Sequence, residues 1–82
     1  MKMDCVIYTK ENCTWCVAAK DFMQRQRCSY KEVKIGEEIL LEEVLQKFPG
    51  VKTVPIITID GEFIGGYNEL VKYFTENGLM LA

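Results

Sequence analysis

Residues 4–35 alternate between strand-like and helix-like patterns, and this alternation constrains the fold more than any other feature. Residues 4–8 are short, β-branched and aromatic, as in a strand, and residues 30–35 alternate apolar and charged side chains, which is also a strand pattern. Between them, residues 14–27 carry apolar side chains at spacings of three and four, which predicts a helix with one buried face. A strand, a helix and a strand in this order imply a right-handed crossover between two parallel strands.

A second helix is expected over residues 37–48. Glu37 and Glu38 suit the positive N-terminal end of a helix, and Pro49-Gly50 suits its end. An apolar stripe predicts the face that this helix buries, and its members are Leu41, Val44, Leu45 and Phe48.

The last part of the chain predicts a hairpin and a third helix. Residues 56–59 and 62–64 have strand composition and are joined by Asp-Gly, a strong two-residue hairpin signal. Residues 68–76 are expected to be helical, with Asn68 as the N-cap. The full order, β-α-β-α-β-β-α, predicts an α/β fold of thioredoxin-like architecture, in which a four-stranded mixed sheet is flanked by three helices.

Composition excludes several classes of function. The chain has 82 residues, of which 49% are hydrophobic, and this predicts a single domain, residues 1–82, with one modest core. The formal net charge of -2 offers no electrostatic attraction to nucleic acid. No apolar run approaches the roughly 20 residues of a membrane span, and the N-terminal region has no signal-peptide pattern. We therefore expect a cytoplasmic protein with neither nucleic-acid nor membrane partners.

Cys13 and Cys16 form a C-x-x-C motif where a loop meets the expected start of a helix. A helix N-terminus lowers a thiol pKa from about 8.5 to roughly 3.5–7.5, because unpaired N–H groups and the helix dipole favour negative charge. Cys13 lies at or before the first turn and gains most, whereas Cys16 lies one turn later on the buried side. This arrangement predicts that Cys13 attacks a disulfide and Cys16 resolves the mixed disulfide. Half of a zinc site is the alternative, but zinc needs further cysteines or histidines nearby, and the chain has no histidine.

Three motifs, in the order and spacing of the family, resemble the glutaredoxins over nearly the whole chain. The run Val6-Ile7-Tyr8-Thr9-Lys10-Glu11-Asn12-Cys13-Thr14-Trp15-Cys16 looks like the opening of a glutaredoxin, Thr53-Val54-Pro55 like its cis-proline loop, and Ile64-Gly65-Gly66-Tyr67-Asn68-Glu69-Leu70 like its glutathione site. The resemblance implies a glutathione:disulfide oxidoreductase that acts as a monomer, takes glutathione as its reducing co-substrate and needs no metal. Its other implied partners are disulfide-containing proteins, with ribonucleotide reductase as one client.

The resemblance also implies which residues hold glutathione. Lys10 would stabilise the Cys13 thiolate and attract a glutathione carboxylate, the Val54 backbone would pair with the ligand as an added strand does, and the glycine pair would let the ligand approach a helix N-terminus. Asn68 would donate its backbone N–H and Glu69 would hold the ammonium group. The complete set of expected glutathione-binding residues is Lys10, Trp15, Lys52, Thr53, Val54, Pro55, Gly65, Gly66, Tyr67, Asn68 and Glu69.

Departures from the family pattern leave alternatives open. Thr14-Trp15 replaces the usual Pro-Tyr between the cysteines, which keeps open an iron–sulfur carrier that binds a cluster between two chains. Glu42 stands where relatives carry an amide or a cation, so Lys52 is expected to supply that cation instead. A redoxin reduced by thioredoxin reductase is a further alternative, against which Lys10 and the glycine pair argue. Cys5 and Cys28 are expected to approach each other, and a second disulfide between them stays open.

Overall fold

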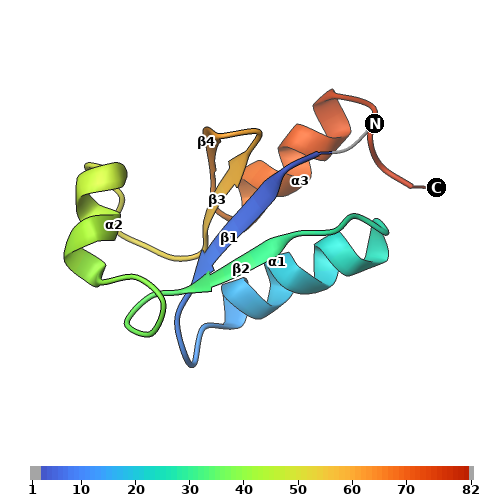
Figure 1. Ribbon diagram of the computed structural model, residues 1–82. Helices are drawn as coiled ribbons and strands as arrows, with labels where there is room; N and C mark the ends of the chain where they lie inside the picture. Colours follow the sequence, from blue (N-terminus) through green and yellow to red (C-terminus); the bar gives the residue numbers. More distant parts are fainter. Residues whose placement is uncertain (1–2, 82) are drawn as a thin grey trace.

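The computed structural model describes residues 3–81. Its strands are β1 (Cys5–Thr9), β2 (Lys31–Lys34), β3 (Ile56–Ile59) and β4 (Glu62–Gly65). They form one mixed sheet in the order β2-β1-β3-β4 (Figure 1). With helices α1 (Thr14–Arg25), α2 (Leu41–Lys47) and α3 (Tyr67–Glu76), the order is β-α-β-α-β-β-α, so the sequence prediction of a thioredoxin-like α/β fold is confirmed.

Strand β1 lies at the centre of the pairing pattern. It is parallel to β2, with Val6 opposite Lys31, and α1 makes the crossover between them. It is antiparallel to β3, which forms the predicted hairpin with β4. The hairpin turn has left-handed backbone at Asp60 (φ 52°) and Gly61 (φ 82°), as a two-residue turn of this type requires.

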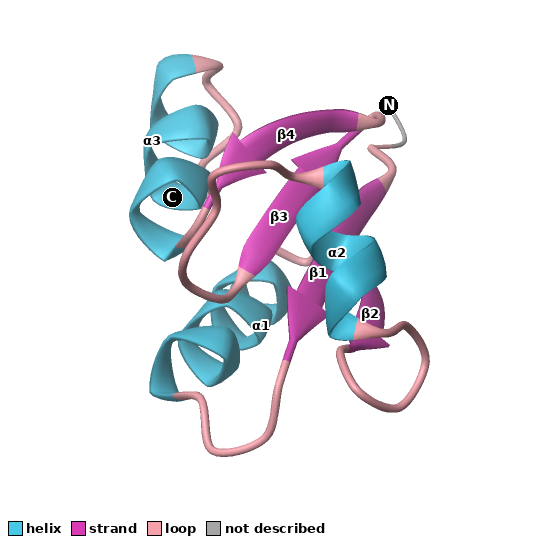
Figure 2. Cartoon of the chain, turned by 90° about the vertical axis from the view of Figure 1, so that its left-hand side faces the viewer, coloured by secondary structure: helices cyan, strands magenta, loops and turns pink. Residues whose placement is uncertain are grey.

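The helices lie on opposite faces of the sheet, with α1 and α3 on one side and α2 on the other (Figure 2). The larger core lies under α1 and α3 and joins Ile7 of β1 to Met23 of α1 and Phe74 of α3, all fully buried. A smaller cluster under α2 contains Tyr8, Val44 and Ile56. Since β3 separates the two clusters, all four of its residues are buried.

Helix α2 is shorter than the sequence predicts. Residues 36–38 form a turn instead, in which the N–H of Gly36 donates to the carbonyl of Ile39 at 2.7 Å and the Glu38 carboxylate accepts the Lys34 N–H at 3.1 Å. The predicted apolar stripe is also partly wrong, because Val44 is buried whereas Leu41 and Leu45 are 54% and 48% exposed. Of the seven residues of α2, Val44 is the buried one.

The other helix ends also differ by a few residues. Helix α1 ends at Arg25 rather than residue 27 because Arg27 adopts a left-handed conformation (φ 55°). The Cys28 N–H then donates to the Met23 carbonyl at 3.0 Å, which is the hydrogen bond of a Schellman helix end. Helix α3 begins one residue earlier than predicted, so the N-cap is Gly66 and not Asn68.

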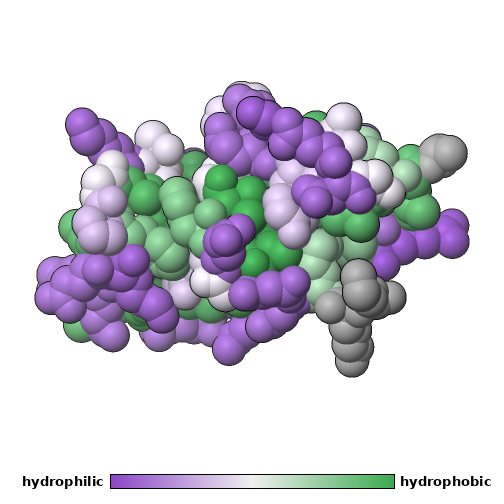
Figure 3. All heavy atoms as spheres, turned by 90° about the horizontal axis from the view of Figure 1, so that it is seen from above, coloured by the Kyte–Doolittle hydropathy of each residue, from purple (hydrophilic) through white to green (hydrophobic). Residues whose placement is uncertain are grey.

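The surface combines charged and apolar areas. Seen from above the view of Figure 1, hydrophobic side chains gather in the middle of one face between hydrophilic ones (Figure 3). Large exposed apolar side chains also occur on α2, on β4 and near the C-terminus, among them Leu41, Leu45, Phe63 and Leu79. In the part of the chain that the structure describes, every helix is too short or too polar to cross a bilayer.

Candidate active site

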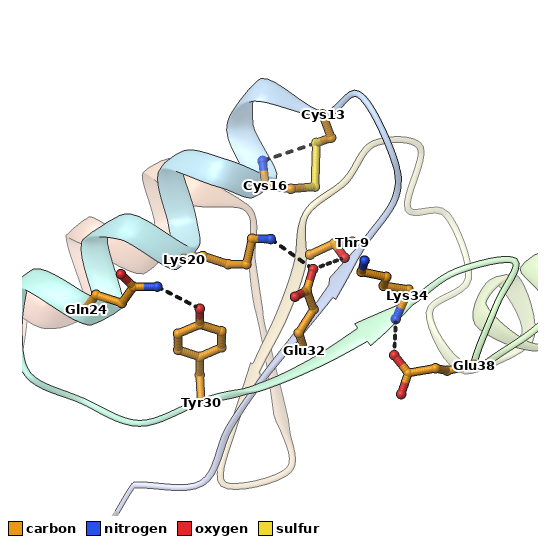
Figure 4. Close-up of polar contacts among 9 residues, drawn as sticks. All are labelled: Thr9, Cys13, Cys16, Lys20, Gln24, Tyr30, Glu32, Lys34 and Glu38. Atoms are coloured by element: carbon orange, nitrogen blue, oxygen red, sulfur yellow. Dashed lines mark hydrogen bonds and ion pairs between the residues drawn. A yellow bond between two sulfur atoms is a disulfide. The ribbon is translucent and has the colours of Figure 1, made fainter.

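Cys13 is the N-cap residue of α1. Its backbone is extended (φ -116°, ψ 103°), and its Sγ accepts the backbone N–H of Cys16 at 3.1 Å (Figure 4). A serine or threonine hydroxyl usually takes this place and satisfies one of the unpaired N–H groups of a helix start. The sulfur atom therefore lies at the positive end of α1, as the sequence predicted.

Cys13 and Cys16 form a disulfide, with their Cα atoms 5.2 Å apart. Cys13 is half-buried, whereas Cys16 is only 2% exposed and lies on the buried face of α1. The two sulfur atoms therefore differ in access: one is at the surface and the other is beneath it.

The proline loop lies against the first cysteine. The Sγ of Cys13 is 3.8 Å from the carbonyl oxygen of Val54, and the Val54–Pro55 peptide bond is cis, as the family resemblance implied. Pro55 is buried, while Lys52 and Thr53 are exposed on the outer part of the loop.

The glycine pair lies next to this loop at the start of α3. A Cβ atom added at Gly66 would be 3.5 Å from the Pro55 carbonyl oxygen. Gly65 has φ 133°, and a Cβ there would come within 2.6 Å of the Glu69 side chain. The Glu69 carboxylate accepts the Gly66 N–H at 2.8 Å, so it caps α3 itself.

Two aromatic rings connect α1 to α3 beside the disulfide. Trp15 is 57% exposed, and its ring centroid is 5.4 Å from that of Tyr67. Tyr67 also meets Phe22 of the core edge to face at 6.3 Å. The three motifs are thus brought together. Cys13 contacts Val54, Trp15 packs against Tyr67, and Gly66 lies close enough to the Pro55 carbonyl that an added Cβ would touch it. Asn68 is exposed in the first turn of α3.

An open cavity of about 580 Å³ lies beside the cysteines and is lined by Lys10, Cys13 and Cys16. Lys20 and Glu32, which the sequence did not predict as site residues, are also on its wall. Glu32 of β2 accepts a hydrogen bond from the Thr9 hydroxyl at 2.7 Å and pairs with the Lys20 ammonium at 3.0 Å (Figure 4). The Thr9 hydrogen bond and the Lys20 ammonium together hold the pKa of Glu32 below its ordinary value, against the opposing effect of partial burial. The one sequence signal for this group is the spacing of four between Cys16 and Lys20, which places both on one helix face.

The other two cysteines are free thiols in the core under α1 and α3. Cys5 is 2% exposed, and burial, followed by the nearby Cys28 and Asp4, raises its pKa from 9.0 to about 11. Cys28 therefore lies close enough to interact electrostatically with Cys5, as the sequence analysis expected. Within residues 3–81, no group of three or more cysteine, aspartate or glutamate side chains is arranged to hold a metal ion.

Comparisons with known proteins agree with this geometry. A family model described as Glutaredoxin matches residues 5–64. Glutaredoxin 1 of Escherichia coli K12 is 37% identical over 82 residues, an alignment that covers 92% of this chain and 96% of the relative.

Solved structures agree with the sequence match. Glutaredoxin 1 from Francisella tularensis, crystallised with cacodylate, aligns with a TM-score of 0.76 at 31% identity and covers 94% of this chain and 96% of that chain. The buckwheat glutaredoxin–glutathione complex shares the fold, with a TM-score of 0.78 at 23% identity over 94% of this chain and 73% of that chain. The match over most of the chain and the disulfide at the N-terminus of α1 lead to one conclusion: this chain belongs to the glutaredoxin family of thiol–disulfide oxidoreductases.

Proposed function

We propose that this protein is a glutathione-dependent thiol–disulfide oxidoreductase in which Cys13 is the attacking thiolate and Cys16 the resolving thiol. The observation that carries the proposal is the position of the Cys13 sulfur as the N-cap of α1, above a buried Cys16. A sulfur that accepts an N–H and lies at the positive end of a helix is stabilised as a thiolate. The buried sulfur is shielded from outside disulfides but adjacent to its partner.

The reaction has four exchanges. The Cys13 thiolate attacks one sulfur of a client disulfide, forms a mixed disulfide and releases the other client sulfur as a thiolate. The Cys16 thiolate then attacks the Cys13 sulfur, which closes the Cys13–Cys16 disulfide and releases the second client thiolate. One glutathione thiolate then attacks the Cys13 sulfur, which forms a Cys13–glutathione mixed disulfide and frees Cys16. A second glutathione thiolate attacks the glutathione sulfur of this mixed disulfide, which frees Cys13 and leaves glutathione disulfide as the product.

Two backbone segments and one solved relative support a glutathione groove around Cys13. The carbonyl oxygen of Val54 is 3.8 Å from the Cys13 sulfur. The Val54 backbone would therefore pair with the peptide part of glutathione, and Thr53 and Pro55 would shape the loop. The first N–H groups of α3, at Tyr67 and Asn68, would bind the γ-glutamyl carboxylate, with Gly65 and Gly66 allowing close approach. The buckwheat glutaredoxin was solved as a complex with glutathione.

Charged side chains around the groove complete the proposed site. Lys10, on the cavity wall with Cys13, would stabilise the thiolate, and the exposed Lys52 would meet the glycyl carboxylate. Glu69 accepts the Gly66 N–H through Oε1, and its carboxylate charge would also attract the ligand's ammonium group. The exposed Trp15 ring, packed at a tilt against Tyr67, would form an apolar rim.

We further infer that the protein acts as a monomeric single domain, residues 1–82, in the cytoplasm, where a reduced glutathione pool is available. Disulfide-containing proteins are its clients, and ribonucleotide reductase is a candidate because its turnover consumes a dithiol. The proposed chemistry uses the two thiols of one chain and glutathione, without a metal.

A coupled assay tests the electron source. Reduction of a mixed disulfide between glutathione and a small thiol is followed with glutathione and glutathione reductase, beside a parallel reaction with thioredoxin reductase. We expect turnover with the glutathione system and little with thioredoxin reductase. Turnover with thioredoxin reductase alone would contradict the proposal.

A further inference from the structure

The cavity beside the disulfide contains a charged cluster for which the proposed exchanges give no role. The cavity is lined by both cysteines, Lys20 of α1 and Glu32 of β2, whereas the residues of the proposed glutathione groove around Pro55 and Gly66 are not on its wall. Lys20 and Glu32 therefore lie on a different side of the cysteine pair from the part of the proposed groove that Pro55 and Gly66 form.

The position of Lys20 in this cavity is set by helix α1 and by an ion pair with Glu32. It follows Cys16 by four residues, so its side chain extends along the same face of α1. Its Nζ is 3.0 Å from Glu32 Oε2, and the same oxygen accepts the Thr9 hydroxyl at 2.7 Å. The Lys20 and Glu32 side chains are 27% and 25% exposed, which is less open to solvent than an ordinary surface pair. Figure 4 shows the cluster directly below the disulfide.

The resolving thiol needs a nearby cation more than the attacking thiol does. Cys16 is 2% exposed, and burial disfavours a thiolate. It also lies inside the helix, so the terminal N–H groups favour it less than they favour Cys13. Yet its proton must leave before it can attack the Cys13 sulfur.

Other charges around the cysteine pair define the electrostatic background. Lys10 and Glu11 come from the loop after β1 and Lys34 from β2, and all three line the cavity. On the α3 side, Tyr67 packs on Trp15, and the Glu69 carboxylate is bound to the Gly66 N–H. Lys20 is the cation of α1 that lies one turn from Cys16, whereas Arg25 is at the other end of the helix and pairs with Asp21.

We propose that Lys20 and Glu32 are positioning residues that set the ionisation of Cys16: the Lys20 ammonium favours the resolving thiolate, and Glu32 fixes that ammonium while opposing its charge. This inference rests on the proposed role of Cys16. It gives the two charges opposite effects on one step, the attack of Cys16 on the Cys13 mixed disulfide. Removal of Lys20 slows this step, and neutralisation of Glu32 speeds it.

Stopped-flow mixing of the reduced protein with dithiobis(nitrobenzoate) isolates the step. Cys13 attacks the aromatic disulfide and releases one coloured nitrothiobenzoate. Cys16 then attacks the Cys13 sulfur, closes the protein disulfide and releases the second. The pH dependence of the second phase reports the ionisation of Cys16, and its absence in Cys16→Ser establishes which thiol resolves.

Lys20→Met should raise the apparent pKa of the second phase and slow it at neutral pH by about two- to fourfold, since part of the lost thiolate is offset by higher intrinsic nucleophilicity. Glu32→Gln, which keeps an acceptor for Thr9, should shift the apparent pKa downwards and speed the phase. Lys20→Arg should stay close to the parent protein because it keeps the cation. Lys31→Met, an exposed lysine at the far end of β2, is the matched control and should change nothing.

The outcomes separate this inference from the proposed function. A second phase that persists in Cys16→Ser would overturn the role of Cys16 itself. A second phase that needs Cys16 but shifts in the same direction in Lys20→Met and Glu32→Gln, or in neither, would overturn the inference alone. Damage to packing would slow both variants, so opposite shifts support an electrostatic role.

Discussion

The sulfur of Cys13 accepts the backbone N–H of Cys16 at 3.1 Å, so one residue of the C-x-x-C motif caps the helix that carries the other. A cap that is also a thiol has its charge state coupled to the start of the helix. The first prediction follows from this relationship.

Cys13 should be alkylated with an apparent pKa clearly below the free-thiol value of about 8.5. Lys10→Glu should raise that apparent pKa and weaken the use of glutathione, because it replaces a cation on the cavity wall with an anion. The pH dependence of iodoacetamide labelling, followed by mass spectrometry, measures the first effect. Lys72→Glu, on the exposed face of α3, is the control. If Lys10→Glu and Lys72→Glu have the same effect on the apparent pKa of Cys13, Lys10 is only a loop residue.

The Trp15 indole should report both the redox state and glutathionylation. Reduction of the Cys13–Cys16 disulfide should raise its fluorescence, because a nearby disulfide quenches indole emission. Glutathionylation of Cys13 in the Cys16→Ser variant should shift the emission again as the ring is covered. An emission spectrum that is the same before and after both reduction and glutathionylation would place Trp15 outside the groove.

Trp15→Ala should raise the KM for a glutathionylated substrate more than it lowers kcat. This is the pattern of lost uniform binding, and it follows if the ring contacts glutathione without taking part in sulfur exchange. Trp15→Phe keeps an aromatic rim against Tyr67 and should retain most of the affinity. Steady-state kinetics on the three proteins provide the measurement, and an equal fall in kcat with unchanged KM would contradict the proposal.

Gly65→Ala should destabilise the fold by about 2 kcal/mol or more, since alanine is strained at positive φ and the new methyl group would also overlap Glu69. Gly36→Ala separates the two causes, because Gly36 has φ 94° but no neighbour within 4 Å. It should therefore lose less stability. Denaturant unfolding measures both, and Glu69→Ala in the Gly65→Ala background should recover part of the loss.

The strand and helix order could be predicted because each element carries its own periodicity, as β1 and α1 do. Helix α2 was overestimated because Glu37 and Glu38 are good residues for a helix start. In the structure, the Glu38 carboxylate instead accepts the Lys34 N–H, and a turn replaces the first helical turn. That competition depends on the position of β2, which local sequence does not show.

The cysteine pair and the three motifs of the site could be found in the sequence because short patterns of special residues carry them. The Thr9–Glu32–Lys20 group could not be found, because it joins a strand end, a second strand and a helix through pairing and packing. The cap of α3 was misplaced for a related reason. Asn68 is the better N-cap by residue type, but the long Glu69 side chain reaches back to the Gly66 N–H.

Stability should fall at alkaline pH through Cys5. Its pKa is raised from 9.0 to about 11, so the folded state holds this proton more tightly than the unfolded state does. The stabilisation that this raised pKa gives to the folded state, up to about 3 kcal/mol, is fully present below about pH 9. It is lost as the pH rises towards 11. Unfolding free energies measured across this range should decline less steeply in Cys5→Ala than in the parent protein. An unchanged slope would contradict the assignment to Cys5.

The division of labour between the two cysteines is the central claim, and turnover of a glutathionylated peptide by Cys13→Ser and Cys16→Ser tests it most directly. Cys13→Ser should be inactive, because no other thiol lies at the helix N-terminus. Cys16→Ser should keep most of this activity, since glutathione can resolve the Cys13 mixed disulfide, while it loses most reduction of a protein disulfide by the dithiol route. Equal loss of activity towards the glutathionylated peptide in both variants would contradict the account.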